Sequence, residues 1–174
     1  MIRVVEHNPD WDRMFQLEAG RIVAALREVA VKVHHIGSTA IRDTKAKPVI
    51  DILLEVTSLE ALDSNEHLLV KRGYEAMREF GIQGRRYFRL DDAAGQRTHQ
   101  VHAFATGTHN VIRHLAFRDY MQAHPQLALA YSSLKERLAV AYPGDRAAYN
   151  AGKHPFIKEH EQLALLWALA RALP

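Results

Sequence analysis

A strand that ends in glycine, followed by a second apolar strand that contains an aspartate, constrains this fold most strongly. Residues Val31–Ile36 are largely β-branched, alternate with period two and run directly into Gly37 and Ser38. Residues Val49–Val56 form a second, mostly apolar stretch that carries Asp51. Because an unpaired charge inside a buried strand is costly, we expect Asp51 to face either a basic partner or a ligand.

The residue types around these two strands suit phosphate chemistry. Gly37 would let the backbone approach a phosphate, and Ser38 would donate its hydroxyl and its N–H to it. Asp51, on the opposite face from Ile50 and Ile52, would hold a divalent cation against the same phosphate. The alternative is that Gly37 and Ser38 form an ordinary turn, while Asp51 pairs with a nearby arginine or lysine.

The remaining sequence predicts one α+β domain over residues 1–174, with a mixed β-sheet, flanking helices and a helical C-terminal third. Asn8 and Pro9 begin a helix that ends near residue 28, and Thr57 with Glu60 forms a capping box for a helix that ends near residue 73. Two further strands are expected at 85–90 and 98–104, joined by a turn at 91–95, and three helices at 110–123, 126–141 and 146–172.

Composition excludes several classes of function. The chain contains no cysteine, which rules out disulfides, thiolate metal sites and a cysteine nucleophile. It has no apolar run near the roughly 18 residues of a membrane span and no signal-peptide pattern at its N-terminus, so we expect a cytoplasmic protein. The net charge of +3 is too small to argue for duplex nucleic acid as a partner, and the aromatic-basic pattern is confined to residues 85–89.

Several segments together resemble the GrpB family, which is similar to the nucleotidyltransferase superfamily and includes members fused to dephospho-coenzyme A kinase. The matching segments are Glu6–Trp11, His35–Ala40, Lys47–Ile52, Arg85–Arg89, His102, Arg113–Tyr120, and Tyr149 with Lys153. The resemblance implies a nucleotidyltransferase-like fold, a nucleotide or phosphorylated small molecule as ligand, and a divalent cation, Mg²⁺ or Mn²⁺.

One position departs from the superfamily pattern. Active members carry Asp-x-Asp in the second strand, whereas Leu53 stands here in the second position. Glu55 lies roughly 7 Å further along a strand, too far to replace it beside two ions about 4 Å apart. Alternation places His102 where it would join Asp51, as a catalytic group and metal ligand, and an imidazole beside a carboxylate would suit one transition metal. The alternative is a histidine bonded to the backbone in the core.

Basic and aromatic side chains complete the predicted site. The residues expected to bind phosphate or nucleotide, besides Gly37 and Ser38, are Lys47, Arg86, Arg118, Tyr149 and Lys153. Arginine offers a planar fork that matches phosphate, and Tyr149 and Lys153 share a helical face because they are four residues apart. Each of these residues has an alternative role as a solvated side chain or as a partner in an ion pair.

Two functions follow from this pattern. The first is a metal-dependent nucleotidyltransferase-like enzyme in which Asp51 and His102 are catalytic. The alternative is a non-catalytic binding or accessory module, related to nucleotides or to the coenzyme A pathway, that has lost the second carboxylate. The leucine and alanine stripe at 162–173 predicts a core-facing helix face, and its alternative is a homodimer contact.

Overall fold

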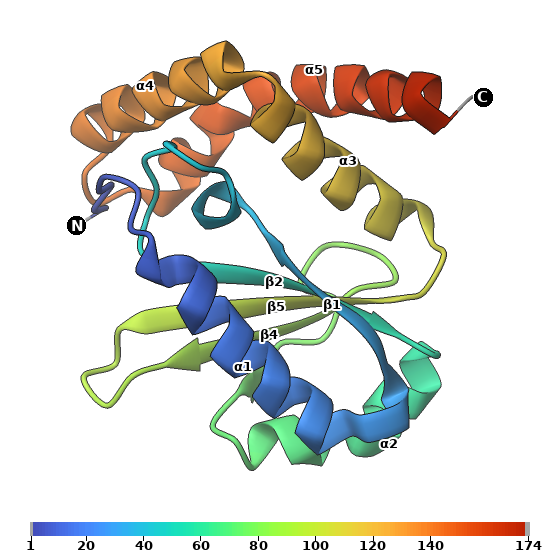
Figure 1. Ribbon diagram of the computed structural model, residues 1–174. Coiled ribbons are helices and arrows are strands. Elements are labelled where there is room, and N and C mark those ends of the chain that lie inside the picture. The colour runs from blue at the N-terminus through green and yellow to red at the C-terminus, as the bar shows by residue number, and fades with distance from the viewer. Residues whose placement is uncertain (1, 173–174) are drawn as a thin grey trace.

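Five strands form one mixed sheet in the computed structural model, which describes residues 2–172 (Figure 1). The strand order is β1-β2-β5-β4-β3. The strands are β1 (Ala30–Ile36), β2 (Ile50–Val56), β3 (Glu75–Ala76), β4 (Arg86–Asp91) and β5 (Arg97–Ala105). The central pair, β2 and β5, is parallel, and the other pairs are antiparallel. The predicted mixed sheet is therefore confirmed.

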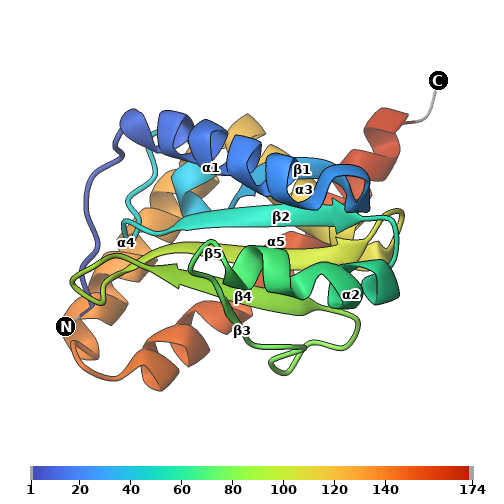
Figure 2. The same ribbon diagram turned by 90° about the horizontal axis from the view of Figure 1, so that it is seen from below.

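Helices cover both faces of this sheet. On one face lie α1 (Asp10–Leu26) and α2 (Leu59–Val70), which are on the near side of the strands in Figure 2. Ile50 and Ile52 point to this face and pack with Trp11 and Ile22 of α1 in the larger core cluster. Alternation along β2 sends Asp51 and Leu53 to the other face, because successive side chains of a strand point in opposite directions.

The helical C-terminal third covers that second face, as the sequence predicts. It consists of α3 (His109–Ala123), α4 (Pro125–Ala141) and α5 (Arg146–Ala172), which lie above the sheet in Figure 1. Leu53 and Phe104 pack against Val111 of α3 in a small cluster. A separate cluster joins the three helices to one another, so the strands and the C-terminal helices meet along a limited contact that leaves room for a cavity at one end.

Local details differ from the sequence predictions at three places. Ser58, rather than Thr57, caps α2, because its hydroxyl accepts the N–H of Ala61 at 3.0 Å. The first helix begins at Asp10, whose N–H is bound by the Asn8 side chain at 3.0 Å. The two-residue strand β3 has no signal in the sequence, since it is too short to show a period.

The end of α5 is only partly core-facing. Ala164 is fully buried, whereas Leu163, Leu166 and Leu169 are at least 41% exposed, so the predicted stripe covers one side of the helix only. Leu173, the last residue of the predicted stripe, lies outside the described residues, and the homodimer contact stays a prediction. Within residues 2–172, no helix combines the length and the apolar character that crossing a membrane requires.

Candidate functional site

A basic cavity of about 540 Å³ opens where β2 and β5 meet α4 and α5. Its lining residues include seven lysines and arginines and, within the described part of the chain, a single carboxylate, Asp51. The basic residues are Lys47, Arg85, Arg89, Arg97, Lys135, Arg146 and Lys153. The predicted site residues Ser38, Lys47, Asp51, His102, Tyr149 and Lys153 therefore lie together in one cavity. We call it the basic pocket.

Gly37 and Asp51 are in direct contact at the base of this pocket. Gly37 adopts φ 71° and ψ −174°, a conformation that is almost restricted to glycine. A Cβ atom at Gly37 would lie 2.6 Å from Oδ2 of Asp51. The next three residues, Ser38–Ala40, form the short 3₁₀ turn η2. The glycine thus allows the turn to cross directly over the carboxylate, which leaves Ser38 and Asp51 beside each other.

His102 holds the Asp51 carboxylate from the neighbouring strand. Its Nε2 lies 3.3 Å from Asp51 Oδ1, and its Nδ1 lies 3.4 Å from Nη1 of Arg85. Because a guanidinium can only donate, Nδ1 must accept, and the proton of the neutral imidazole is then on Nε2. His102 therefore donates to Asp51. Both of its ring nitrogens are engaged in this arrangement, which gives His102 the geometry of a group that positions the carboxylate.

Lys47 and Lys153 flank the ring of Tyr149 on the opposite wall of the pocket. Their Nζ atoms lie 4.5 Å and 4.6 Å from the ring centroid. Burial, together with the charge of the nearby Lys47, lowers the pKa of Lys153 to about 8. Burial also lowers the pKa of Lys47, assisted by repulsion from Arg146. These cations are crowded and partly desolvated, and an anion placed among them would relieve the repulsion.

Lys135, on α4, is a pocket residue that the sequence analysis missed. It is 3% exposed, its Nζ donates to Ser38 Oγ at 2.8 Å and to the carbonyl of Lys45, and it lies over the Tyr131 ring. Burial, together with the charge of Lys153, lowers its pKa to about 7. A lysine in a helical segment is typical of a solvated surface, so nothing local marks it; only the packing of α4 onto the η2 turn brings it to Ser38.

Two predicted ligand-binding arginines lie outside the basic pocket. Arg86 points to the α2 face, where its Nε and Nη2 donate to Asp63 at 2.7 Å and 2.8 Å. Arg118 donates to Asp119 at 2.7 Å and to the carbonyl of His35 at 3.1 Å. Both arginines therefore have the alternative role that the sequence analysis gave them, as partners in an ion pair. Arg85 and Arg89, whose alternation with Arg86 sends them to the other face, line the pocket instead.

The carboxylates near Asp51 do not form a two-metal site. Leu53 fills the second acidic position and is fully buried. Glu55, two residues further along, is bound by His34 Nε2 at 2.6 Å and by Thr106 Oγ1 at 2.9 Å, away from the pocket. Across residues 2–172, no three histidine or acidic side chains are grouped for metal binding. The donor set fits at most one cation that takes most of its oxygens from a ligand, which matches the way Mg²⁺ binds with few protein carboxylates.

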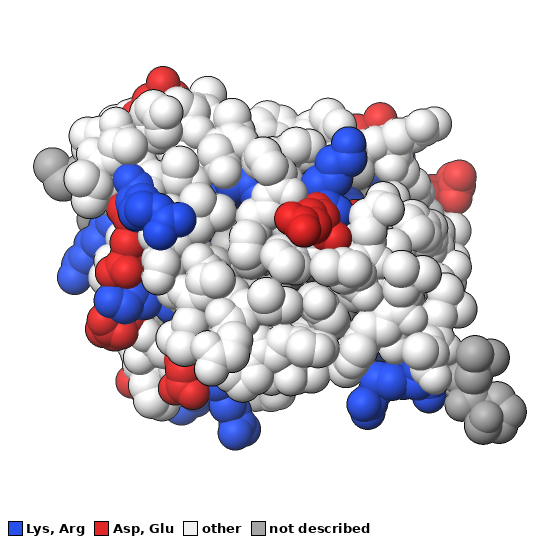
Figure 3. All heavy atoms as spheres, turned by 90° about the horizontal axis from the view of Figure 1, so that it is seen from above, with Lys and Arg blue, Asp and Glu red and all other residues white. Residues whose placement is uncertain are grey.

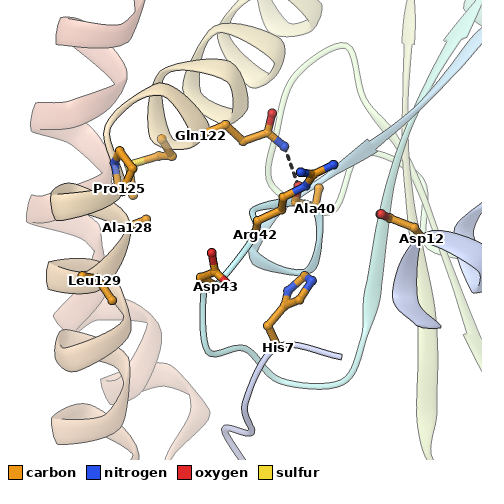
Figure 4. Close-up of a pocket in the computed structure, with 10 residues that line it drawn as sticks. His7, Asp12, Ala40, Arg42, Asp43, Gln122, Pro125, Ala128 and Leu129 are labelled. Atoms are coloured by element: carbon orange, nitrogen blue, oxygen red, sulfur yellow. Dashed lines mark hydrogen bonds between the residues drawn. The ribbon is translucent and has the colours of Figure 1, made fainter. Parts of the chain in front are cut away.

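A second cavity of about 560 Å³ lies on the far side of the η2 turn, between that turn and α4 (Figure 4). Its charged residues are of mixed sign: Asp12, Arg42 and Asp43. Asp12 is 3.3 Å from His35 Nδ1, and His35 Nε2 is 2.9 Å from Thr39 Oγ1, so a short chain of polar groups links the two cavities. Mixed charge gives this cavity no preference for anions, unlike the basic pocket.

Charge is also sparse over the outer surface of the C-terminal helices. Seen from above, this face is largely uncharged, with a few basic and acidic groups that lie mostly toward its edges (Figure 3). The pocket gathers seven basic residues around one carboxylate in a protein whose net charge is only +3. Two of the seven, Arg89 and Arg97, are paired with Glu75 and Asp91, and five remain. A positive potential that is focused in a cavity attracts and orients anionic ligands.

Sequence comparison decides the family. The profile of the GrpB protein family matches residues 1–163. The chain belongs to the GrpB family. Over 170 residues it is 38% identical to YqkA of Bacillus subtilis, covering 98% of this chain and 49% of YqkA. It is also 29% identical over 190 residues to the dephospho-CoA kinase of Mycolicibacterium paratuberculosis, covering 96% of this chain and 47% of that protein. This GrpB chain thus spans about half the length of these two curated relatives.

Solved structures confirm the fold. The crystal structure of GrpB from Enterococcus faecalis matches with a TM-score of 0.90 and 40% identity, covering 96% of this chain and 99% of that one. The structure of Cid1 in complex with its short product ApU matches with a TM-score of 0.56 and 10% identity, covering 86% of this chain and 48% of that one. The likeness to Cid1, a poly(U) polymerase, shows that this GrpB protein has a nucleotidyltransferase-like fold.

Proposed function

We propose that this GrpB protein binds a nucleotide, or another small molecule that carries a polyphosphate, in the basic pocket. The observation that carries the proposal is the charge of the lining, with seven basic side chains around one carboxylate. Lys47, Lys135 and Lys153 line the pocket together with the η2 turn, and Lys135 donates to Ser38 Oγ. Ser38 offers a hydroxyl there, and Gly37 allows close approach of the backbone. Charge-assisted hydrogen bonds from such groups are the usual way proteins hold phosphate.

In this proposal Asp51 shares one divalent cation, Mg²⁺ or Mn²⁺, with the phosphate oxygens of the ligand. The cation would offset the repulsion between the carboxylate and the phosphates. His102 acts through Asp51, since its Nε2–H fixes one carboxylate oxygen and leaves the other toward Gly37. Lys153, whose pKa is lowered to about 8, takes up a proton as an anion binds beside it. Affinity for polyphosphate should therefore fall as the pH rises from about 7 to about 9.

A ligand panel tests the proposal. Thermal unfolding is followed with tripolyphosphate and with each nucleoside triphosphate, with and without Mg²⁺. A ligand at 100 times its dissociation constant adds about 2.7 kcal/mol to the free energy of unfolding, which is easily measured. Lys153→Ala should remove most of this stabilisation. Arg86→Ala is the matched control, because it also removes one positive charge but lies outside the pocket. Equal losses in both variants, or no stabilisation by any phosphate, would contradict the proposal.

Nucleotidyl transfer is the second candidate, and the position of Asp51 favours it. The carboxylate is 30% exposed in its side chain, faces the basic pocket and is held by His102. Transfer would form a bond from an acceptor hydroxyl oxygen to the α-phosphorus and break the bond from that phosphorus to the oxygen bridging to the β-phosphorus. Pyrophosphate would leave with the bridging oxygen, and the hydroxyl proton would pass to a base such as water. The missing second carboxylate at Leu53 argues for the non-catalytic binding module instead. Pyrophosphate release together with a nucleotidylated acceptor, both dependent on Mg²⁺ and both lost in Asp51→Asn, would establish transfer. Stabilisation by nucleotides without release would support the binding module.

A further inference from the structure

An exposed aromatic side chain borders the basic pocket. Phe80 lies in the loop between β3 and β4, lines the pocket and is 59% exposed. It has φ +44°, and the next residue, Gly81, has φ +84°. A bulky residue in the left-handed region is uncommon, because the conformation costs free energy and persists only where the surroundings impose it. The loop therefore keeps a large apolar ring in water with a strained backbone, and core packing does not explain this arrangement.

Arg85 holds this loop in place. Arg85 is only 6% exposed. Its Nη2 donates to the carbonyl of Phe80 at 2.7 Å, and its Nε donates to the carbonyl of Glu79 at 3.1 Å. Its third contact is His102 Nδ1 at 3.4 Å. One buried cation therefore ties the backbone of the exposed phenylalanine to the histidine that holds Asp51. These bonds hold the backbone of Phe80 relative to the base of the pocket.

The rings form a continuous row from the mouth of the pocket to its carboxylate. Phe80 stacks on Tyr87 with centroids 5.4 Å apart and planes 29° apart. Tyr87 in turn lies 5.3 Å from the ring of His102. One face of Phe80 is used by this stack, and the residue remains largely exposed. A cavity of about 540 Å³ is within the range of roughly 300 to 1,000 Å³ that small-molecule ligands occupy.

We propose that Phe80 is a stacking platform for a nucleobase, so that the pocket selects nucleoside polyphosphates over inorganic polyphosphate. The inference rests on the proposed function and adds a determinant of specificity to it. Aromatic rings stack on bases of any sequence, because every base has a π-face. The basic residues would recognise the phosphates, and Phe80 would recognise the planar ring at the other end of the same ligand.

Isothermal titration calorimetry with two kinds of probe tests this role. The probes are tripolyphosphate, which has no ring, and the triphosphates ATP, GTP, CTP and UTP. The wild-type protein should bind at least one nucleotide about 5- to 150-fold more tightly than tripolyphosphate, the range that stacking of one base supplies. Phe80→Ala should remove this preference without changing the affinity for tripolyphosphate. Phe80→Trp should keep it, which separates stacking from damage to the loop.

Leu166→Ala on α5 is the matched control, because it also truncates an exposed apolar residue, at 65% exposure, and should change neither affinity. The platform alone is overturned by equal binding of nucleotides and tripolyphosphate by the wild type, or by a Phe80→Ala variant that keeps the preference. A loss of tripolyphosphate binding in Phe80→Ala also overturns it, since the ring would then support the pocket rather than the base. Failure of every phosphate to bind the wild type overturns the proposed function itself, and the platform with it.

Discussion

Among the glycines with positive φ, replacement of Gly37 by alanine should destabilise the protein the most. Two costs combine there. The conformation at φ 71° and ψ −174° is nearly closed to residues with a side chain, which costs about 1–3 kcal/mol. The new Cβ would also lie 2.6 Å from Asp51 Oδ2 and 3.0 Å from Asp51 Cβ, and such overpacking typically costs another ~1–3 kcal/mol. The expected loss is therefore about 2–6 kcal/mol.

Gly95→Ala is the comparison variant that adds a methyl group at positive φ without a close contact. Gly95 has φ +74°, close to that of Gly37, but no atom lies within 4 Å of a Cβ built on it. Its substitution should cost only about 1–2 kcal/mol. Urea unfolding of both variants, followed by tryptophan fluorescence, to which the buried Trp11 contributes, gives the comparison. If Gly37→Ala loses no more stability than Gly95→Ala, the close contact between the η2 turn and Asp51 is not a constraint on the fold, and the reasoning about the pocket base fails.

Three further outcomes are expected. Arg86→Ala should cost about 1 kcal/mol through the lost pair with Asp63 yet leave triphosphate affinity unchanged, and a large loss of affinity would place Arg86 in the site after all. Ser58→Ala should cost about 1 kcal/mol by uncapping α2, whereas Thr57→Ala should not. Burial lowers the pKa of His114 from 6.5 to about 4, so its contribution to stability is complete above pH 6.5 and is lost as the pH falls toward 4. Over that interval the loss in the free energy of unfolding approaches ~3 kcal/mol. A His114→Asn variant whose urea midpoint declined as steeply with falling pH as that of the wild type would show that His114 is not the cause.

The sequence predicts the strands and helices well because their periods and boundaries are local properties. The strand at Val31–Ile36, the turn after it and all three C-terminal helices appear within a residue or two of the expected ends. The alternation that places His102 on the face of Asp51 is also a local property, and the parallel pairing of β2 with β5 makes it a contact. What the sequence predicts less well depends on which elements pack together.

Arg86 and Lys135 illustrate that limit from opposite sides. Arg86 lies in one of the segments that resemble the family, yet one step of strand alternation turns it toward Asp63 and away from the pocket. Lys135 has no local signal, but the packing of α4 on the η2 turn buries it against Ser38. Phe80 is a third case, because its exposure at the pocket mouth follows from the loop that Arg85 anchors. These positions depend on contacts between residues distant in the chain, which no local pattern encodes.

The burial of Leu53 also decides how the missing carboxylate should be interpreted. Leu53 is 0% exposed and packs with Ile36, Phe104 and Val111, so the second acidic position of the superfamily is here part of the apolar core. An aspartate at that position would be a buried charge with no partner. We therefore expect Leu53→Asp to lose about 3–5 kcal/mol or more, as is typical of an uncompensated buried charge. Leu53→Ala, which only opens a cavity, should lose about 2–5 kcal/mol independently of pH. The aspartate variant should recover part of its loss at low pH, where the carboxyl is protonated. A Leu53→Asp protein that instead kept wild-type stability and gained stabilisation by Mg²⁺ would mean that the pocket still accommodates a second metal ligand, and would favour a recently lost nucleotidyltransferase over a dedicated binding module.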